Sequence, residues 1–431
     1  MLWVVLVGSL LLWAGCASSG ETDEDESPAD RVEPLTEVDK GLATPSDEVG
    51  VVQLYRSGDE RRLPVLPLQG SDAHLTLRFD LLEARGRPLS IHFYHADREW
   101  ERRLSPSEFM SGFQRDNLLD YTQSQGTEVP YAHYSYHFPN DDIQFRVSGN
   151  YVLRVTEQRD RDDVLFEKPF YVTEGGGQIS TEVENVRLSG QRRPSLLPRT
   201  VFTPPSDLRG DPQRYELCVV RNGRFDQVRC QDRPRLTRQP ELEFDLQRRE
   251  AFAPSTADYF LDLSALQSGG AIERVDRSRS PYRVLLAPDY ARFSGRQQGM
   301  PLDGQVLIDR VVRDVGTPHT QAEYVETHFS FVPPEGERLD SDPAVTGPFK
   351  GGGDGSHDLN WDEDRDRYEG TALLKQGQYE YFYSSTDPNL ATRMQRNAPR
   401  AQDRFTAFVY YDDPSLNTDR LVALDQVEVR P

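Results

Sequence analysis

Histidines are the first side chains in this sequence to consider for metal or acid–base chemistry. His133 and His137 are four residues apart, so on a strand they share one face, whereas His92 and His95 fall on opposite faces. A closed zinc shell needs four ligands, and no Cys or further His stands near either pair to complete one. We therefore expect half-buried or loop histidines and no metal site.

Glycine-rich and acidic segments resemble ligand loops only in composition. Residues 351–355 lack the Gly-Lys-Ser/Thr of a phosphate loop, and residues 362–366 lack the alternating ligands and the Gly of a calcium loop. With 71 Asp and Glu residues, pairs of acids arise everywhere, so none can be assigned to glycoside hydrolysis. No Gly-x-Ser-x-Gly or Cys–His motif is present. The sequence predicts no enzyme, no cofactor and no small-molecule substrate.

The chain is strongly acidic, with 431 residues and a formal net charge of −21. Of its 50 basic residues only four are Lys, and the rest are Arg. Such a surface repels the phosphates of nucleic acid, which argues against that partner. It suits work in high salt, where screening shortens the range of self-repulsion, and a GC-rich genome that favours Arg and Asp codons explains it equally well.

The N-terminal residues 1–16 predict an export signal. An apolar run over residues 1–15 is too short to span a bilayer permanently, and it ends in Ala-Gly-Cys16, which resembles a bacterial lipobox. No Lys or Arg precedes the run and Trp13 stands three before the Cys, so an ordinary signal peptide or a missing upstream start codon stays open. Residues 17–47 are rich in Ser, Thr, Pro and acids, which predicts a disordered tether behind a lipid on Cys16.

Short alternating segments dominate the rest of the chain. Apolar residues recur at every second position in 51–55, 75–79 and 151–155, and turn residues separate the segments. This pattern is typical of antiparallel β-sandwiches of the immunoglobulin or fibronectin type. The triple glycine at 175–177 indicates a boundary. We therefore predict an all-β fold of tandem sandwiches, with a first domain over 48–174, a second over 175–275 and a C-terminal domain over 276–431.

A hairpin is predicted around Asn222-Gly223, a two-residue turn pair between alternating segments that contain Cys218 and Cys230. In the simple register residue 218 faces residue 227, which leaves Cys230 about 10 Å further along the strand, beyond the reach of a disulfide. A bulge together with an oxidising compartment would allow the bond. Cys218 and Cys230 are therefore candidate disulfide partners.

The densest stretch runs from residue 97 to residue 155. Trp100, Phe109 and Phe113 are large apolar residues among charges, and the step from Phe109 to Phe113 is one helical turn. We expect these three rings to pack together under a long crossing loop. An aromatic run over 131–138 stops at Pro-Asn, and Ser-Gly-Asn at 148–150 leads into an alternating strand.

The order of these residues resembles the first domain of the plug proteins of the type IX secretion translocon, found in Bacteroidetes-like bacteria. The spacings are long and irregular, which makes the pattern specific. The matching positions are Trp100, Ser107, Glu108, Phe109, Gly112, Phe113, Asp120, Tyr121, Ser124, Gly126, Thr127, Tyr131, His133, Tyr134, Phe138, Pro139, Asn140, Ser148, Gly149, Asn150 and Tyr151.

Later segments are similar to the same family. They comprise an Asn-Gly-Arg-aromatic-Asp turn, a Leu-Lys-Gln-Gly-x-Tyr-x-Tyr strand pair, and a closing strand followed by a turn and Asp-Arg-Leu. The matching positions are Asn222, Gly223, Arg224, Phe225, Asp226, Leu374, Lys375, Gln376, Gly377, Tyr379, Tyr381, residues 405–411, Asp413, Pro414, Asp419, Arg420 and Leu421.

This resemblance implies a non-enzymatic protein on the periplasmic side of the outer membrane. Such a plug occludes the pore of the translocon barrel through protein–protein contacts while no substrate is engaged. The lipobox departs from the plain signal peptide expected of a soluble plug. The alternative is a glycan-binding surface or periplasmic lipoprotein, which exposed, coplanar Tyr and Trp rings would favour. A carboxylate-based hydrolase would need two acids facing each other in a cleft.

Overall fold

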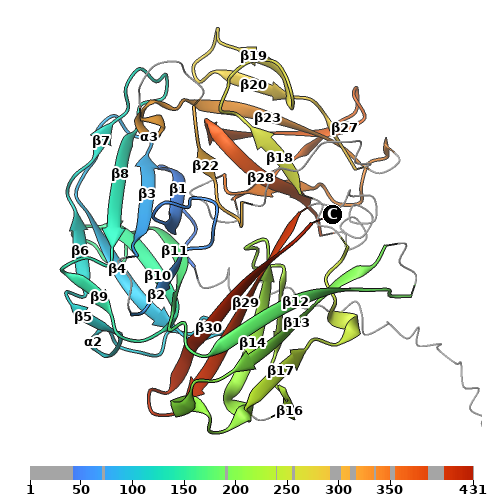
Figure 1. Cartoon of the computed structure of the whole chain (residues 1–431). Coiled ribbons are helices and arrows are strands. Elements are labelled where there is room, and N and C mark those ends of the chain that lie inside the picture. The colour runs from blue at the N-terminus through green and yellow to red at the C-terminus, as the bar shows by residue number, and fades with distance from the viewer. Residues whose placement is uncertain are drawn as a thin grey trace, which may run out of the picture. The chain divides into compact units, whose positions relative to one another are not determined.

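Three β-sandwiches make up the described part of the chain in this computed structural model, which confirms the predicted all-β class (Figure 1). The structure describes residues 42–69, 73–189, 193–238, 240–254, 258–291, 302–310, 317–333, 336–349, 355–386 and 402–430. All of them fall in one compact unit, Pro34–Pro431. Among these residues, no helix has the length and apolar content needed to cross a bilayer.

The first sandwich packs a sheet of order β1-β3-β8-β7 on a sheet of order β2-β11-β10-β4-β6. Alternation places Phe79, Phe93 and Tyr151 inward, where each is at most 1% exposed. The helix α2 (Pro106–Phe109) and the strand pair β5 (Met110–Gly112) and β9 (Ile143–Phe145) lie in the crossing segments. The sheet strands are β1 (Val49–Arg56), β2 (Val65–Pro67), β3 (Leu75–Leu81), β4 (Leu89–Ala96), β6 (Arg115–Leu118), β7 (Thr122–Gln123), β8 (Ala132–Phe138), β10 (Gly149–Glu157) and β11 (Val164–Thr173).

The second sandwich packs a sheet of order β12-β13-β17-β16 on a sheet of order β15-β14-β29-β30. Its core includes Phe202, Leu217, Phe244 and Phe405, all fully buried. The strands are β12 (Gln178–Val186), β13 (Ser195–Thr203), β14 (Tyr215–Arg221), β15 (Val228–Gln231), β16 (Arg235–Arg238), β17 (Glu241–Asp245), β29 (Asp403–Asp413) and β30 (Thr418–Val429). Short 3-10 turns are η2 (Ser206–Leu208), η3 (Pro212–Arg214) and η4 (Arg248–Glu250).

The third sandwich packs β18-β28-β24-β25, with β22 beside β28, on β19-β20-β23-β27-β26, with β21 beside β23. Tyr324, Phe329, Tyr379 and Tyr381 dominate its core. The helix α3 (Pro318–Gln321) precedes β23. The strands are β18 (Tyr259–Asp262), β19 (Ile272–Asp276), β20 (Arg283–Leu286), β21 (Asp289–Tyr290), β22 (Leu307–Ile308), β23 (Tyr324–Val332), β24 (Ala344–Gly347), β25 (Gly355–Asp358), β26 (Asn360–Asp362), β27 (Arg367–Lys375) and β28 (Gly377–Ser384).

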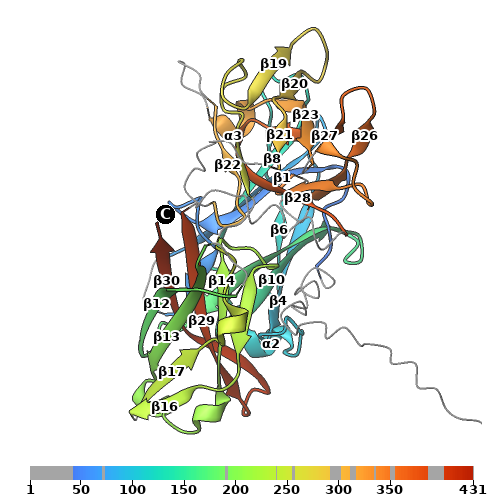
Figure 2. The same ribbon diagram turned by 90° about the vertical axis from the view of Figure 1, so that its right-hand side faces the viewer.

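Strand pairing does not follow the predicted boundary near residue 275. The last two strands, red in Figures 1 and 2, belong to the second sandwich. Strand β29 pairs with β14, in a register that runs from Tyr215↔Tyr411 to Arg221↔Phe405, and β30 pairs with β29. Strand β18, which the sequence places in the second domain, pairs with β28 of the third sandwich. Local patterns could not reveal these partners, because the pairing joins segments that are far apart in the chain.

The hairpin of β14 and β15 forms as predicted, but its register differs. Residues 222–227 make a longer connection than a two-residue turn, closed by the bond from Arg221 N–H to the carbonyl of Gln227. Cys218 consequently faces Cys230 directly rather than residue 227. The structure joins the two sulfurs in a disulfide, with the Cα atoms 4.0 Å apart.

Candidate functional site

A buried lysine joins the first sandwich to the third. Lys375 lies at the end of β27 and is 1% exposed, and its Nζ donates to Asp80 Oδ2 on β3 at 2.6 Å. Nζ also donates to the carbonyl of His319 at 2.6 Å and lies 4.1 Å from the ring centroid of Tyr131. We call this contact the Lys375 joint.

Asp80 is the acceptor at the centre of the Lys375 joint. It is fully buried, its Oδ2 also accepts from the Tyr324 hydroxyl at 2.7 Å, and its Oδ1 lies 2.7 Å from His133 Nδ1. Burial by itself would raise the pKa of Asp80, but Lys375 and His133 outweigh burial and hold this pKa below its usual value. The carboxylate is therefore ionised at neutral pH, and its oxygens are occupied by neighbours rather than available to a substrate.

The turn at Asn222-Gly223 is a second meeting point, which we call the Asn222 joint. Asn222 donates from Nδ2 to Asp403 at 3.0 Å and accepts the backbone N–H of Arg404 at 2.8 Å. Gly223 has a φ of +64°, and a Cβ there would stand 2.2 Å from the carbonyl oxygen of Asp303. Only glycine combines this backbone conformation with such a close approach.

Two buried ion pairs support the Asn222 joint. Arg221 is fully buried and donates to both carboxylate oxygens of Asp403, at 2.9 and 2.6 Å. Arg404 donates to Asp303 at 2.6 Å. Burial raises the pKa of Asp303 to about 6, although Arg404 opposes the shift. Both carboxylates are thus used to fix arginines and not to transfer protons.

The residues after Gly223 reach the other two sandwiches. Arg224 pairs with Asp258, and its guanidinium carbon lies 3.8 Å from the ring centroid of Phe382 on β28. Phe225 contacts the ring of Trp100 edge-on, with centroids 5.6 Å apart. The Asn-Gly-Arg-aromatic-Asp turn therefore touches the third sandwich through Arg224 and the first through Phe225.

The Asp-Arg-Leu segment after β29 forms a third contact, the Asp419 joint. Asp419 accepts from Arg98 Nη1 with both oxygens at 3.0 Å, and Arg420 donates to both oxygens of Glu174 at 2.7 and 2.8 Å. Both pairs link the first sandwich to β30. The bidentate, planar pair of Arg420 with Glu174 fixes the orientation of the contact.

Gly149, Asn150 and Tyr151 lie beside the Asp419 joint at the start of β10. All three are buried, and Asn150 Oδ1 accepts from the Tyr410 hydroxyl on β29 at 2.8 Å. The amide of Asn150 donates to the carbonyl of Asp97 at 2.9 Å. Gly-Asn-Tyr thus begins a core strand and also contributes to the contact with the second sandwich.

The predicted packing of Trp100, Phe109 and Phe113 against one another is wrong. Phe109 is fully buried in the first core, with its ring 5.7 Å from that of Tyr151. Trp100 is half-buried and packs on Tyr171 of β11 at 5.7 Å and on Phe225, so it belongs to a contact between sandwiches. Phe113 is 65% exposed.

The exposure of Phe113 has a local cause. The helix α2 ends at Phe109, because Met110 is extended and begins β5. Gly112 follows with a φ of +93°, and the N–H of Phe113 bonds to the carbonyl of Asp142. The four-residue step from 109 to 113 is therefore not a helical turn, and the two rings point to different environments.

Other aromatic motif residues lie in the cores. Tyr131 and Tyr134 are fully buried, and Tyr379 is 1% exposed. Their hydroxyls donate to backbone carbonyls: Tyr131 to Ala322 at 3.0 Å and Tyr134 to Arg87 at 2.7 Å. Gly377, at the start of β28, lies directly against the backbone of β22.

The four histidines considered from the sequence do not gather into one site. His133 belongs to the Lys375 joint, and the others contact hydroxyls or a carbonyl. The contacts are His137 Nδ1 with Thr76 Oγ1 at 3.0 Å, His92 Nε2 with Thr156 Oγ1 at 3.3 Å, and His95 Nε2 with the carbonyl of Ser148 at 3.0 Å.

One group of potential metal ligands is found among the described residues. It consists of Glu216, Cys218 and Cys230, whose ligand atoms lie within 4.8 Å of one another. The two sulfurs are bonded to each other, so neither offers the thiolate that a metal needs.

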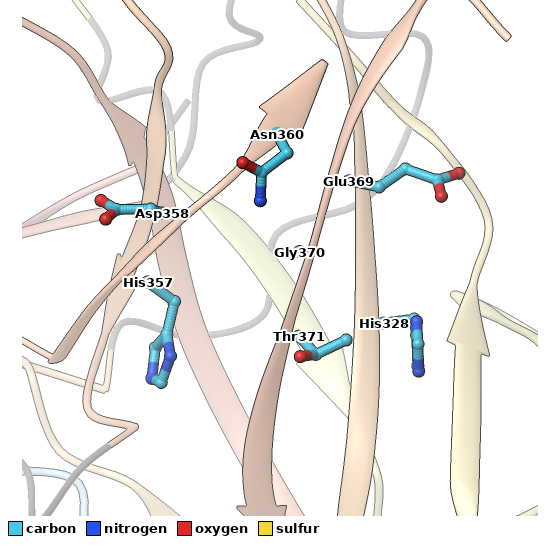
Figure 3. A pocket seen from close by; sticks show the side chains of 7 residues that line it. All are labelled: His328, His357, Asp358, Asn360, Glu369, Gly370 and Thr371. Carbon is cyan, nitrogen blue, oxygen red and sulfur yellow. The ribbon is translucent and has the colours of Figure 1, made fainter. Parts of the chain in front are cut away.

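A shallow polar depression of about 340 Å³ lies on the third sandwich. Figure 3 shows that the carboxylates of Asp358 and Glu369 point to opposite sides, and His328 is bonded to Glu326 at 2.8 Å. These side chains do not converge on one point, as an acid–base pair requires. The lining residues are His328, His357, Asp358, Asn360, Glu369, Gly370 and Thr371.

Sequence reasoning missed the partners of the motif residues. Asp80, Arg98 and Asp403 carry the three joints, but no spacing rule links them to their partners. One signal was available: Lys375 is one of four lysines and directly follows two leucines at the end of an alternating segment, a position that favours a buried, paired cation. Cys16, the tether up to residue 41 and residues 351–354 lie outside the described residues.

This architecture is similar to that of a solved protein. A hypothetical protein from Parabacteroides merdae ATCC 43184 has a TM-score of 0.79 and 24% identity, covering 90% of this chain and 99% of that one, which shows the same fold. The partial N-terminal region of an enterococcal surface protein reaches a TM-score of only 0.20 at 8% identity, over 91% of this chain and 97% of that one, too low to indicate a common fold.

Comparison with known sequences concerns the first sandwich. No curated protein matches the chain. The family model described as "Type 9 secretion system plug protein 1st domain" matches residues 49–174, the segment from β1 to the end of β11 and the following residue. The resemblance to the type IX secretion plug family is therefore confirmed over residues 49–174.

Proposed function

We propose that this protein is a plug of the type IX secretion translocon, which occludes the idle pore from the periplasmic side through protein–protein contacts. The observation that carries this proposal is the family match over residues 49–174. The family match supports association with the secretion machinery, and pore occlusion by this chain is the finer step that we propose.

The three joints are consistent with a plug whose sandwiches must keep a fixed arrangement while the protein occupies a pore. Each has an ion pair between sandwiches with at least one buried partner: Lys375–Asp80, Arg404–Asp303 and Arg98–Asp419. Arg221–Asp403 supports the Asn222 joint from within the second sandwich. Such pairs hold a fixed geometry, because separating them would leave charges uncompensated. Residues that could suggest chemistry in the sequence, among them Lys375 and His133, act here as structural contacts, in keeping with a non-enzymatic role.

Phe113 is the residue that we propose for the contact with the barrel. It is exposed although its neighbours Phe109 and Met110 are buried, so it offers apolar surface that a partner can cover. Phe113→Arg should abolish recovery of the translocon barrel with the tagged protein. Tyr290→Arg, at a 52% exposed ring on the third sandwich, is the matched control and should leave recovery unchanged.

We also propose that Cys16 carries a lipid that anchors the protein to the periplasmic face of the outer membrane. An anchor raises the effective concentration of the plug near the pore without any new contact. Cys16→Ser should move the protein from the membrane fraction to the soluble fraction. A variant that stays with the membrane at both low and high salt would contradict lipid anchoring and leave the plug proposal standing.

Deletion of the gene tests the occluding role directly. An unplugged pore leaks, so sensitivity to large antibiotics should rise, and wild-type protein supplied from a plasmid should restore resistance. Affinity purification should recover the outer-membrane barrel. Unchanged permeability together with no recovered barrel would refute the plug proposal.

Glycan binding gains no support from the described rings. Sugar stacking needs exposed, coplanar aromatic faces. The motif tyrosines other than Tyr121 are buried, and the exposed rings, Phe113, Tyr121 and Tyr290, belong to different strands or loops. We therefore propose no second function.

A further inference from the structure

A cluster of arginines stands on the outer face of the first sandwich. In the register of the sheet, Arg115 of β6 faces His92 of β4, which faces Arg154 of β10, which faces Glu167 of β11. Side chains directly opposite one another across antiparallel strands project from the same face. Three basic positions and one acid thus form a continuous row on a chain whose net charge is −21.

Tyr94, two residues further along β4, gathers the guanidinium groups. The guanidinium carbons of Arg102, Arg154 and Arg161 lie 4.7, 4.8 and 5.7 Å from its ring centroid. Arg161 also donates to the Tyr94 hydroxyl at 3.0 Å. Stacking on an aromatic face fixes guanidinium groups in place while their N–H donors stay at the rim.

Carboxylates neutralise this row only in part. Glu167 accepts from Arg154 at 2.6 Å and from Arg102 at 2.8 Å. Among the described residues, Arg115 and Arg161 pair with no carboxylate, and the Asp116 side chain instead accepts from the Tyr136 hydroxyl at 2.8 Å. Burial, with Arg161, Arg115 and Arg154, lowers the pKa of His92 to about 4, so this ring adds no charge at neutral pH.

We propose that Arg115, Arg154 and Arg161, around His92 and Tyr94, form a binding site for the phosphate group of a phosphate monoester. A guanidinium presents a planar fork of donors that matches oxyanions. One fork satisfies the two oxygens of a carboxylate, whereas a phosphate dianion has three terminal oxygens and can accept from several forks at once. Phosphate therefore uses this set of donors better than a carboxylate does.

The charge of the rest of the molecule limits the size of the ligand. A net charge of −21 repels an extended polyanion such as nucleic acid, and it disfavours an anionic bilayer lying flat on the surface. A single phosphate group needs only the local row. The group could belong to a soluble compound or to a lipid headgroup, and the two sources share the same chemistry.

Titration of the full chain at low ionic strength tests the site. Calorimetry should show that glycerol 3-phosphate binds at one saturable site. Co-flotation of the protein with phosphatidylcholine vesicles that contain phosphatidic acid should show whether the site binds a lipid headgroup. The double variant Arg115→Gln/Arg161→Gln should weaken binding about tenfold or more, since it removes two charged donors. Neither side chain has an ion-pair partner in the described residues, and Arg161 loses only an exposed hydrogen bond and a ring contact with Tyr94, so thermal unfolding should change little.

Arg187→Gln is the control, because it removes an exposed arginine that directly follows β12 on another sandwich. It should leave the affinity for either probe unchanged. If the double variant loses binding of the soluble probe or of the vesicles, the result supports the site. Which of the two probes binds then identifies the source of the phosphate. No saturable binding of either probe, or equal binding by wild type and double variant, would overturn it. This outcome is independent of the plug function.

Discussion

Replacing Lys375 with methionine is the sharpest test of the Lys375 joint. Methionine keeps most of the length and apolar volume of the lysine stem, so the change removes the ammonium group while creating little cavity. Asp80 stays fully buried and keeps its contacts with Tyr324 and His133, but its positive partner is gone. The His319 carbonyl also loses one of its two donors and keeps the Tyr131 hydroxyl.

The expected loss in the free energy of unfolding at pH 7 is about 3–5 kcal/mol, the cost of leaving one partner of a buried ion pair uncompensated. The variant can also avoid the uncompensated charge by protonating Asp80, so the free energy of that protonation is an upper limit to the loss. With an ordinary pKa of 3.8, protonating this carboxyl at pH 7 costs about 4 kcal/mol, at 1.36 kcal/mol per pH unit. The penalty of Lys375→Met should therefore shrink as the pH falls toward 4.

Urea unfolding followed by pulse proteolysis measures the loss in full-length protein, with each sandwich read separately in case they unfold in steps. The double variant Lys375→Met/Asp80→Asn removes both charges and should recover most of the stability. A penalty below about 1 kcal/mol for the single variant, or a double variant less stable than the single one, would refute our account of the joint as a paired buried charge.

Three further predictions concern the other contacts. Burial, with Asp258 and Asp303, raises the pKa of Glu380 to about 8 from 4.5. The folded state therefore holds the proton more tightly than the unfolded state, and this residue lowers stability as the pH rises from about 4.5 to 8. Glu380→Gln should stabilise the protein at pH 8 but not at pH 4 in chemical denaturation. Gly223→Ala should destabilise the protein far more than Gly126→Ala in thermal unfolding. Both glycines have a positive φ, near +64° and +69°, but only a Cβ at Gly223 would meet other atoms, because no atom lies within 4 Å of a Cβ at Gly126. Equal losses would contradict the close approach at the Asn222 joint. Replacing both Cys218 and Cys230 with alanine should lower the free energy of unfolding by about 2–3 kcal/mol relative to untreated wild type, as expected for a disulfide that closes a loop of 12 residues. Wild type treated with a reductant should have the same stability as the variant.

Period-two patterns predicted individual strands well. The segments 51–55, 75–79 and 151–155 lie inside β1, β3 and β10, because each has one face in the core of the first sandwich. The fold class followed from many such segments. Even the aromatic run at 131–138 corresponds to β8.

Connections and long-range partners could not be predicted in the same way. The step from Phe109 to Phe113 has helical spacing, yet an extended Met110 ends the helix, and nothing in the spacing shows this. The hairpin at Asn222 keeps its turn residues but carries a longer connection, and Asn222 is hydrogen-bonded to Asp403 at the start of β29, a partner that no local pattern indicates. Contacts between sandwiches depend on which strands meet in space, and local patterns along the sequence do not reveal this.

The position of β29 and β30 has a consequence for the order in which the chain can fold. Strand β14 obtains its central neighbour only when residues 403–429 are available, and all of the third sandwich is synthesised before them. Until then the second sandwich presents an unpaired strand edge, which is prone to intermolecular pairing. The second sandwich must therefore be the last to close, after the third has formed as an insertion within it. A chain truncated before residue 403 should lose not its last domain but the middle one, and an exporter that delivers the C-terminus last would keep the protein open until transport is complete.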